Sequence, residues 1–522
     1  MDAMPWDARP SILHHVREHI PARGPGLDSG GNTLPDDGRQ VTTGGLTWGS
    51  GSLDGVFTHH ARHETGEAGA EVVELVLRYC EEPTATNLAA AYRRVIETGA
   101  LAVIDQVVPE LMQRPLDRRR LVELAYTFAS VGADREPVKF GMAILGACQP
   151  ADDYSDLFLT LGRHEEFTLF AAVALVNSRD NAERKLFELA RSVTGWGRIH
   201  VVERLAGTDD PEIKQWLLRE GFRNDILYEY LAWTCATAGG LLAALSEDQI
   251  DRELLTAAGQ IINSLILGGP AEDMDDYDDG ALAVEMYLRH LEPAASTWSD
   301  LNTVRAINDF ASADADDARV ARGWSSTRRA GIRESCARIC NMPYWRELVL
   351  SVTADVDHQD FHRASGAADM LGLDVWEPRL RWLAAEPLSA WRWCHVMNRC
   401  TDQQIDQFVS LAARTLDLQH IATGPALEAG FGGEFEPHGC LVMVLQELRR
   451  FPGHGLELIE AGLSSPVINN RGMATRCMAA LPTRWPEPLR SRLEAAAAIE
   501  PHDGVRALMK KVLSGDPLDE DE

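Results

Sequence analysis

The sequence predicts an all-α protein: an α-solenoid of stacked antiparallel helix pairs, preceded by a Gly/His-rich, largely irregular N-terminal segment. From Glu71 onward, apolar residues recur at the i, i+3, i+4 spacing of amphipathic helices. Gly, Pro, Asp or Asn interrupts this pattern at intervals of roughly 12 to 18 residues, which is typical of helix ends. No segment shows the strict apolar and polar alternation of a half-buried β-strand. We therefore expect helices joined by short turns.

The pattern defines individual helices. In residues 101–112, apolar side chains occupy one helical face, and a second helix is expected over residues 117–130. Two antiparallel helices joined by a short turn form a helical hairpin. The same reasoning predicts a helix at residues 165–178, a turn at 179–181 and a helix at 182–193.

A 29-residue register links several of these hairpins. It relates three sets of residues in the first half of the chain: Phe158, Phe187 and Trp216; Val138, Phe167 and Trp196; and Ile144, Val173, Val202 and Leu231. A unit of this size cannot bury its apolar face alone and must stack on its neighbours.

Residues 134–245 and 436–513 resemble the HEAT and armadillo class of helical repeats. Residues 467–481, with the sequence VINNRGMATRCMAAL, are similar to the turn and helix that open such a repeat. The resemblance is to a class and not to one family. It implies scaffolding and ligand binding, without a particular reaction.

The helical pattern and its interruptions divide the chain into seven segments. We expect a Gly/His-rich extension (1–70), helical repeats (71–268), an acidic loop (269–280), a helical middle region (281–420), a Gly-rich loop (421–436), C-terminal helical repeats (437–515) and an acidic tail (516–522). Long loops inside a folded chain are frequently functional.

Charge and cysteine content restrict the partners and the compartment. A formal net charge of -29 repels phosphate backbones, so nucleic acid is an unfavourable partner. Nine cysteines without a CxxC pair are typical of reduced thiols. No apolar stretch reaches the ~18 residues that span a bilayer, and the N-terminus lacks a secretory apolar core. We expect a cytoplasmic protein.

The common signatures of enzymes are missing from the sequence. No Gly-Lys dipeptide occurs, which excludes a Walker A loop, and no Gly-x-Ser-x-Gly elbow is present. No cofactor can be identified from motifs. The one metal hypothesis places zinc or iron on His59, His63 and Glu67, which would share a helix face. The competing interpretation is that these histidines lie on the surface or pack against other residues.

The acidic loop carries six carboxylates between Glu272 and Asp279. Its spacing does not fit an EF-hand, because Tyr277 and Met286 would occupy ligand positions. A solvated loop, or a docking site for a basic partner, explains it better than a calcium site.

The segment that opens a helix at residues 195–204 is the best candidate binding site. It places five unusual side chains inside the regular repeats: Trp196, Arg198, His200, Glu203 and Arg204. In the register, Ile199 is the buried residue, so Arg198 and His200 should project away from the buried stripe. This pattern predicts an anion or carboxylate pocket at a helix start, or alternatively a polar network that bridges neighbouring repeats.

Three functional hypotheses follow. The first is a binding scaffold for a protein partner, with a small-molecule ligand as the other option, along a surface capped by the N-terminal segment. The alternative is a metal-dependent or polar-pocket enzyme that combines the N-terminal histidines with Arg198 and His200. A third, a helical-repeat enzyme resembling the alkylpurine glycosylases, conflicts with the acidic charge because it requires a basic groove.

Overall fold

A computed structural model of the chain describes residues 6, 9–39, 67–148, 151–481 and 487–518. Within these ranges every regular element is a helix, and the one β-bridge joins Glu428 to Val467. The prediction of an all-α protein is therefore confirmed. The chain forms two compact units, Met1–Ile339 (unit 1) and Cys340–Glu522 (unit 2).

Unit 1 contains the helices of the first two thirds of the chain. They are α1 (Ile12–Glu18), η1 (Asp37–Arg39), α3 (Glu67–Glu81), α4 (Ala85–Thr98), α5 (Ala100–Gln113), α6 (Arg118–Val131), α7 (Arg135–Cys148), η3 (Ala151–Tyr154), α8 (Ser155–Leu161), α9 (Glu165–Val176), α10 (Ala182–Ala190), α11 (Trp196–Glu203), α12 (Pro211–Trp216), η4 (Leu217–Gly221), α13 (Glu229–Gly239), α14 (Leu241–Leu245), α15 (Arg252–Leu267), α16 (Gly280–Leu291), α17 (Trp298–Ser312), α18 (Asp317–Ala321) and α19 (Ser326–Cys340).

Unit 2 contains the remaining helices. They are α20 (Pro343–Ala354), α21 (Phe361–Met370), α22 (Trp376–Ala385), α23 (Ala390–Met397), α24 (Ile405–Thr415), α25 (Leu418–Ile421), η5 (Gly433–Phe435), α26 (Glu436–Leu448), α27 (Leu456–Leu463), α28 (Ile468–Ala479), α29 (Glu487–Ile499) and α30 (Asp503–Ser514).

Side-chain caps fix where many helices begin. Asp117 precedes α6 and accepts the backbone N–H groups of Arg119 and Arg120. Thr297 and Asp300 form a reciprocal capping box at the start of α17. Such caps satisfy N–H groups that have no partner inside the helix, and each is worth about 1 kcal/mol. The predicted helices at 101–112, 117–130 and 165–178 correspond to α5, α6 and α9, with ends that differ by no more than two residues.

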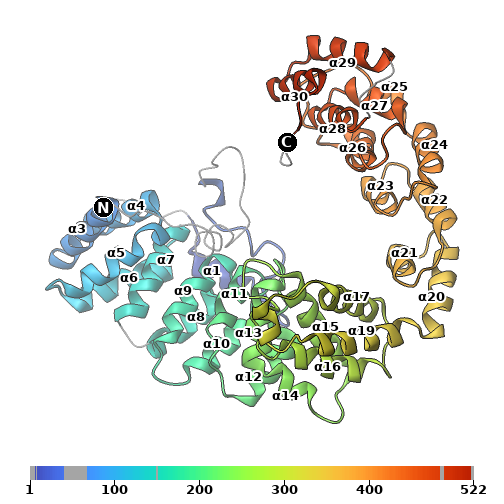
Figure 1. Cartoon of the computed structure of the whole chain (residues 1–522). Coiled ribbons are helices and arrows are strands. Elements are labelled where there is room, and N and C mark those ends of the chain that lie inside the picture. The colour runs from blue at the N-terminus through green and yellow to red at the C-terminus, as the bar shows by residue number, and fades with distance from the viewer. Residues whose placement is uncertain (1–5, 7–8, 40–66, 149–150, 482–486, 519–522) are drawn as a thin grey trace. The chain divides into compact units, whose positions relative to one another are not determined.

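Helices of unit 1 pack in chain order (Figure 1). Each of α5, α7, α9, α11, α13 and α15 contacts the second helix after it, so these helices and α17 form one continuous row. Helices between them contact the row from outside, as α6 does on α7 and α10 does on α11. Most contacts therefore join elements that are close in sequence.

The 29-residue register falls on equivalent helices. Phe158, Phe187 and Trp216 lie on α8, α10 and α12, and the two phenylalanines are buried. The edge of Phe187 meets the ring of Trp216, with centroids 5.3 Å apart. One position departs from the pattern: Val173 on α9 is 47% exposed, whereas Ile144, Val202 and Leu231 are buried.

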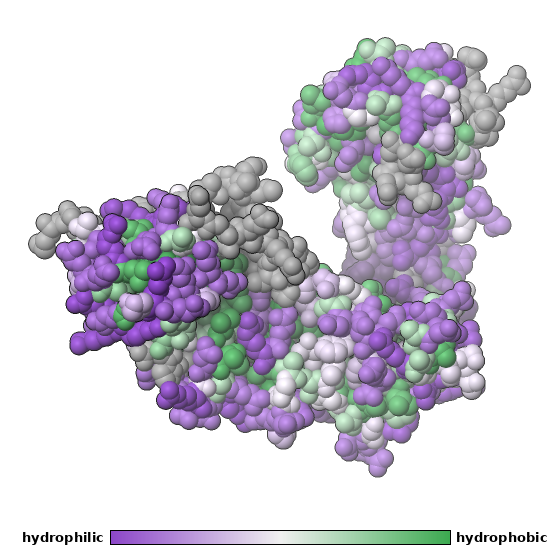
Figure 2. Space-filling view, turned by 60° about the vertical axis from the view of Figure 1, so that its left-hand side comes forward, coloured by the Kyte–Doolittle hydropathy of each residue, from purple (hydrophilic) through white to green (hydrophobic). Residues whose placement is uncertain are grey.

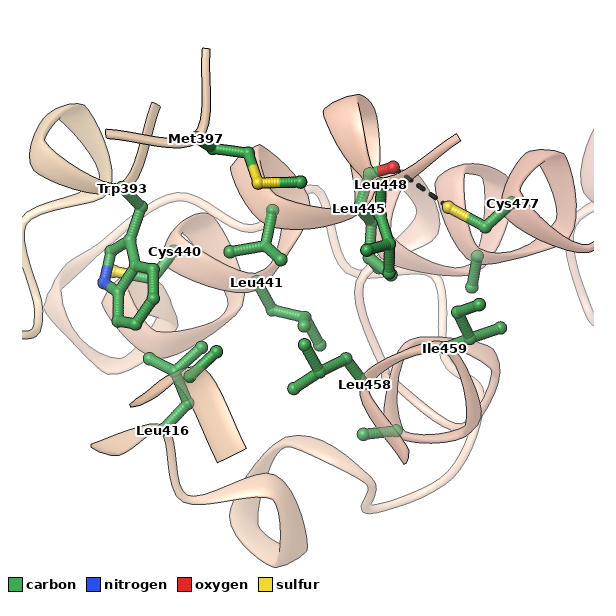
Figure 3. Packing of buried hydrophobic residues seen from close by; sticks show 14 of the residues in the cluster. Trp393, Met397, Leu416, Cys440, Leu441, Leu445, Leu448, Leu458, Ile459 and Cys477 are labelled. Carbon is green, nitrogen blue, oxygen red and sulfur yellow. Dashed lines mark hydrogen bonds between the residues drawn. The ribbon is translucent and has the colours of Figure 1, made fainter. Parts of the chain in front are cut away.

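Unit 2 is built on a row of α23, α26, α28 and α30, each of which packs on the next. Figure 3 shows its apolar core, in which Trp393, Leu441 and Leu458 lie among residues from α23, α26 and α27. Trp393 is fully buried, and its indole N–H donates to the carbonyl of Pro387 at 2.8 Å. The thiol of Cys477 donates to the Leu445 carbonyl at 2.9 Å.

On the face shown in Figure 2, hydrophilic residues predominate among the coloured atoms and apolar residues form scattered patches. In the described ranges, no helix combines the length and the apolar character needed to cross a bilayer.

Candidate functional site

The start of α11 is held by a carboxylate from α9, the preceding helix of the row. Glu165, at the start of α9, accepts the backbone N–H groups of Thr194, Gly195 and Gly197 at 3.3, 3.1 and 2.5 Å. Burial raises the pKa of Glu165, and the three N–H bonds oppose that shift. Gly197 is required by close packing, because a Cβ there would lie 2.6 Å from the Thr168 hydroxyl. Glu165 therefore joins α9 to α11.

Arg198 extends this connection toward the next pair of helices. Its Nε donates to the Val193 carbonyl at 2.8 Å, and its Nη1 donates to the Arg223 carbonyl at 2.8 Å. The guanidinium also lies over the ring of Trp216, 5.8 Å from the centroid. Burial lowers the pKa of Arg198, although Glu220, Asp225 and Glu165 partly compensate. Its main contacts are with the protein's own backbone.

The other four predicted site residues lie along the same helix. Trp196 packs edge to face on Tyr230 at 5.1 Å, and Arg204 donates to the carbonyl of His200. Burial raises the pKa of Glu203; Arg204 opposes this shift, and Glu272 of the acidic loop reinforces it. The end of α11 and the acidic loop therefore influence each other electrostatically.

The structure brings the five predicted residues together on α11, but two of them are not where we expected. Arg198 and His200 are only 8% and 4% exposed. We expected both side chains to project away from the buried stripe. Of the two, Arg198 reaches a neighbouring segment. The register identified Ile199 as buried, and it is fully buried. Because α11 is short and other helices pack on several of its sides, the positions beside Ile199 are buried as well. This arrangement is typical of a network that bridges repeats; a binding role of these residues stays a prediction.

The N-terminal segment runs across the turns that precede the helices of this row. Arg9 forms an ion pair with Asp134 at 2.7 Å, just before α7. The backbone N–H of Ile12 donates to Gly132, and that of Gly26 donates to Ser192, at 2.9 and 2.7 Å. Residues 9–39 therefore form a strap that follows the helix starts of α7 and α11, and α1 also contacts α6 and α8.

A buried ionic cluster anchors the end of the strap. Arg135 on α7 pairs with Asp36 at 3.1 Å, with Asp37, and with Glu166 on α9 at 3.3 Å. Lys139 binds the second oxygen of Glu166 at 2.8 Å. Burial alone would lower the pKa of Arg135, but Asp36 and Glu166 reverse this effect and raise it. The cluster therefore connects the strap, α7 and α9.

His164 makes the neighbouring helix start sensitive to acid. It is fully buried, and its Nδ1 accepts the N–H of Glu166 as the N-cap of α9, at 3.2 Å. Burial lowers its pKa from 6.5 to about 4. An unfolded chain takes up this proton below about pH 6.5, whereas the folded chain does not until about pH 4, so stability falls across that window as the pH falls.

Replacement of His164 with asparagine should remove this pH dependence and retain an N-cap acceptor. We expect the wild type to lose on the order of 2 to 3 kcal/mol of stability between about pH 7 and about pH 4.5 through this residue. When urea unfolding is measured at the two pH values, the stability lost by His164→Asn should be smaller than the wild-type loss by that amount. Equal losses in both proteins would show that His164 does not control the transition.

The predicted metal residues are only partly within the described chain. His59 and His63 lie outside it, and Glu67 is the first residue of α3. In the described ranges, no three His, Cys, Asp or Glu side chains are grouped as a metal ion would require. Zinc or iron at the N-terminal histidines stays an untested hypothesis.

The acidic loop between α15 and α16 is held in place by residues in its middle. Met274 and Tyr277 are 1% and 4% exposed, and the N–H of Met274 donates to Leu265 at 2.9 Å. Arg319 forms two bonds with the Asp275 carboxylate, one of them 2.6 Å long. Burial, reinforced by Asp279, raises the pKa of Tyr277. The loop is therefore an ordered part of unit 1.

This loop forms one wall of a groove of about 500 Å³ against α13 and α14. Trp233 is half-buried there, and its indole N–H donates to the Asp276 carbonyl at 3.3 Å. The groove is lined by apolar and small residues and by three aspartates: Trp233, Ala236, Thr237, Gly240, Leu242, Ala243, Ser246, Asp276, Tyr277, Asp278 and Asp279. Among the described residues, no lysine or arginine lines it.

The charge of the groove is only partly balanced by nearby residues. Arg322 lies 3.7 Å from Asp276 and 3.6 Å from Asp278, so one cation faces two carboxylates. Asp278 is 91% exposed. Sequence analysis singled out the loop but missed Trp233 and the α13–α14 wall, because their spacing is that of ordinary helix packing.

Comparisons with known proteins identify no relative. No protein-family model matches the chain, and no curated protein matches it. Among solved structures, the chain is similar to a crystal structure of an engineered protein, with 15% sequence identity and a TM-score of 0.25, over 86% of this chain and 98% of that one. A TM-score this low carries no argument about fold or function.

Proposed function

We propose that the chain is an α-solenoid of HEAT-like repeats that acts as a cytoplasmic binding scaffold for a protein partner. The continuous row of α5, α7, α9, α11, α13, α15 and α17 supports this, because each element stacks mainly on its neighbours. Bridges such as Glu165 to Gly197 stiffen the row. Free cysteines at all nine positions agree with a reducing compartment.

The partner, in this proposal, inserts a Lys- or Arg-rich segment into the groove between α13, α14 and the acidic loop. The observation that carries the proposal is that an indole wall and three aspartates line the groove, with no lysine or arginine among the described lining residues. Carboxylates pair with the cationic head of such a side chain. The face of Trp233 adds a cation–π contact of about 0.5–2 kcal/mol, and the small residues Ala236 and Ala243 leave room for an aliphatic stem.

Electrostatic attraction brings such a segment to the groove. The chain carries a net charge of -29, and the acidic loop itself contributes six carboxylates. Long-range attraction raises the rate of association, whereas the groove supplies specificity. Nucleic acid is repelled by the same field.

The test uses a fluorescent twelve-residue peptide rich in lysine and arginine, titrated with the full chain and followed by anisotropy. The triple variant Asp276→Asn, Asp278→Asn, Asp279→Asn should weaken binding at least about tenfold, since each charge-assisted bond is worth ~1.5 kcal/mol or more. Trp233→Ala should weaken it by about threefold or more.

A matched variant separates the groove from general charge. Glu81→Gln, Glu82→Gln, Asp105→Asn removes the same number of exposed carboxylates from α3 to α5 of the same unit. It should change the affinity by less than about threefold, because exposed charges at a distance are screened by salt. Equal losses in the two triple variants would contradict the proposal.

A further inference from the structure

A second hollow, in unit 2, has the opposite charge. It measures about 740 Å³ and lies where the C-terminal ends of α26, α28 and α30 meet α29. Arg449, Arg476 and Arg490 line it, one from each of three elements, together with Asp516 and the apolar residues Leu481 and Leu513. Pockets of this volume take small molecules of drug or cofactor size.

The structure uses Arg449 and Arg490 only in part for its own packing. Arg449 donates through Nε to the Gln446 carbonyl at 3.1 Å, and within the described chain it has no carboxylate partner. Arg490 pairs with Glu494 at 3.2 Å across an exposed helix turn, where an ion pair is worth little. Its Nη2 also donates a long hydrogen bond of 3.4 Å to the Leu513 carbonyl. Both side chains can therefore turn toward a ligand at small cost.

The charge around the pocket departs from that of the whole chain. Within the described chain, three arginines and one carboxylate, that of Asp516, are the charged residues that line the pocket, in a protein whose net charge is -29. Asp516 itself accepts the Ser514 hydroxyl at 2.5 Å. Cations also offset the carbonyl ends of helices, which accounts for Arg476 in the last turn of α28 and for Arg449 at the end of α26. It does not account for Arg490, near the start of α29.

We propose that this arginine pocket binds a compact small-molecule polyanion bearing phosphate or carboxylate groups. Guanidinium groups recognise such groups through paired N–H donors. Leu481 and Leu513 form an apolar wall for the rest of the molecule. The site is independent of the acidic groove in unit 1, and the two take ligands of opposite charge.

The experiment titrates the full chain with sodium tripolyphosphate and, separately, with citrate by isothermal calorimetry at low ionic strength. We expect one equivalent of at least one anion to bind, with an affinity that falls as salt is added. The anion that binds more tightly identifies the head group. Absence of binding by both anions would overturn the proposal.

The variant Arg449→Ala, Arg490→Ala should weaken binding at least about tenfold. Both side chains are exposed, so its melting temperature should stay close to that of the wild type. The control Arg346→Ala, Arg414→Ala removes two exposed arginines elsewhere in unit 2 and should change the affinity by less than about threefold. An unchanged affinity in the pocket variant, or an equal loss in the control, would overturn the proposal.

Discussion

Replacing Arg471 with methionine is expected to destabilise unit 2 by about 3–5 kcal/mol, because it leaves a buried carboxylate without its cation. The side chains of Arg471 and Glu500 are 0% and 1% exposed. Nε and Nη2 of Arg471 donate to the two oxygens of Glu500 at 2.6 and 2.7 Å. Nη1 donates to Ser465 and Pro466, and Nη2 also donates to Ala426, each at 2.8 Å. All five N–H donors of the guanidinium are therefore used.

The measurement is hydrogen exchange of peptides from residues 426–514 combined with urea unfolding. Arg471→Met should lose protection in α28 and in the loop that contains Ala426, since both depend on the same guanidinium. The double variant Arg471→Met, Glu500→Met should recover much of the loss, because no charge stays buried without a partner. Arg346→Ala, at an exposed position, serves as the control and should change stability by less than about 0.5 kcal/mol. A loss below about 1 kcal/mol for Arg471→Met would contradict this account.

The second large effect is expected at Arg135. Arg135→Met removes the cation shared by Asp36, Asp37 and Glu166. Asp36 and Glu166 are 8% and 7% exposed, so we expect unit 1 to lose about 3–5 kcal/mol. The strap should also detach from α7, and cleavage by trypsin at Arg17 or Arg23 should become faster.

Two further variants distinguish a held strap from a general loss of stability. Asp36→Asn weakens the strap side of the cluster and should also accelerate cleavage at Arg17 or Arg23. Arg119→Met removes an exposed arginine of α6, 87% exposed in its pair with Glu123, and should leave both stability and cleavage nearly unchanged. If Arg135→Met unfolds at the wild-type urea concentration, the cluster does not anchor the strap.

Helices were predictable from this sequence because periodicity reports burial directly. The apolar face of α5, the cap at Asp117 and the turn before α10 are all local signals. The 29-residue register also located positions on equivalent helices, although Val173 is exposed. Contacts between helices that are close in sequence repeat along the chain. The local spacing of apolar residues was therefore sufficient to predict them.

Polar contacts between distant segments could not be predicted in the same way. Asp36 and Arg135 are 99 residues apart, and nothing in the spacing of either residue indicates the other. Arg471 lies in a segment that resembled the start of a repeat. Its partner, Glu500, is identified only by the structure, in which both side chains are buried. For Arg198 and His200, the register indicated which residue of α11 is buried but not that neighbouring helices enclose the adjacent positions. The same limitation hid Trp233, whose partner is the carbonyl of Asp276.

We propose that a basic segment of a partner binds between α13, α14 and the acidic loop. The most direct test is photo-crosslinking of the full chain with the lysine- and arginine-rich peptide carrying a benzophenone, followed by mass spectrometry of the linked sites. We expect crosslinks to concentrate within residues 233–246 and 276–279, the two ranges that contain the residues lining the groove. We expect them to disappear in Asp276→Asn, Asp278→Asn, Asp279→Asn. Crosslinks spread over the acidic surface, unchanged in that variant, would contradict the claim.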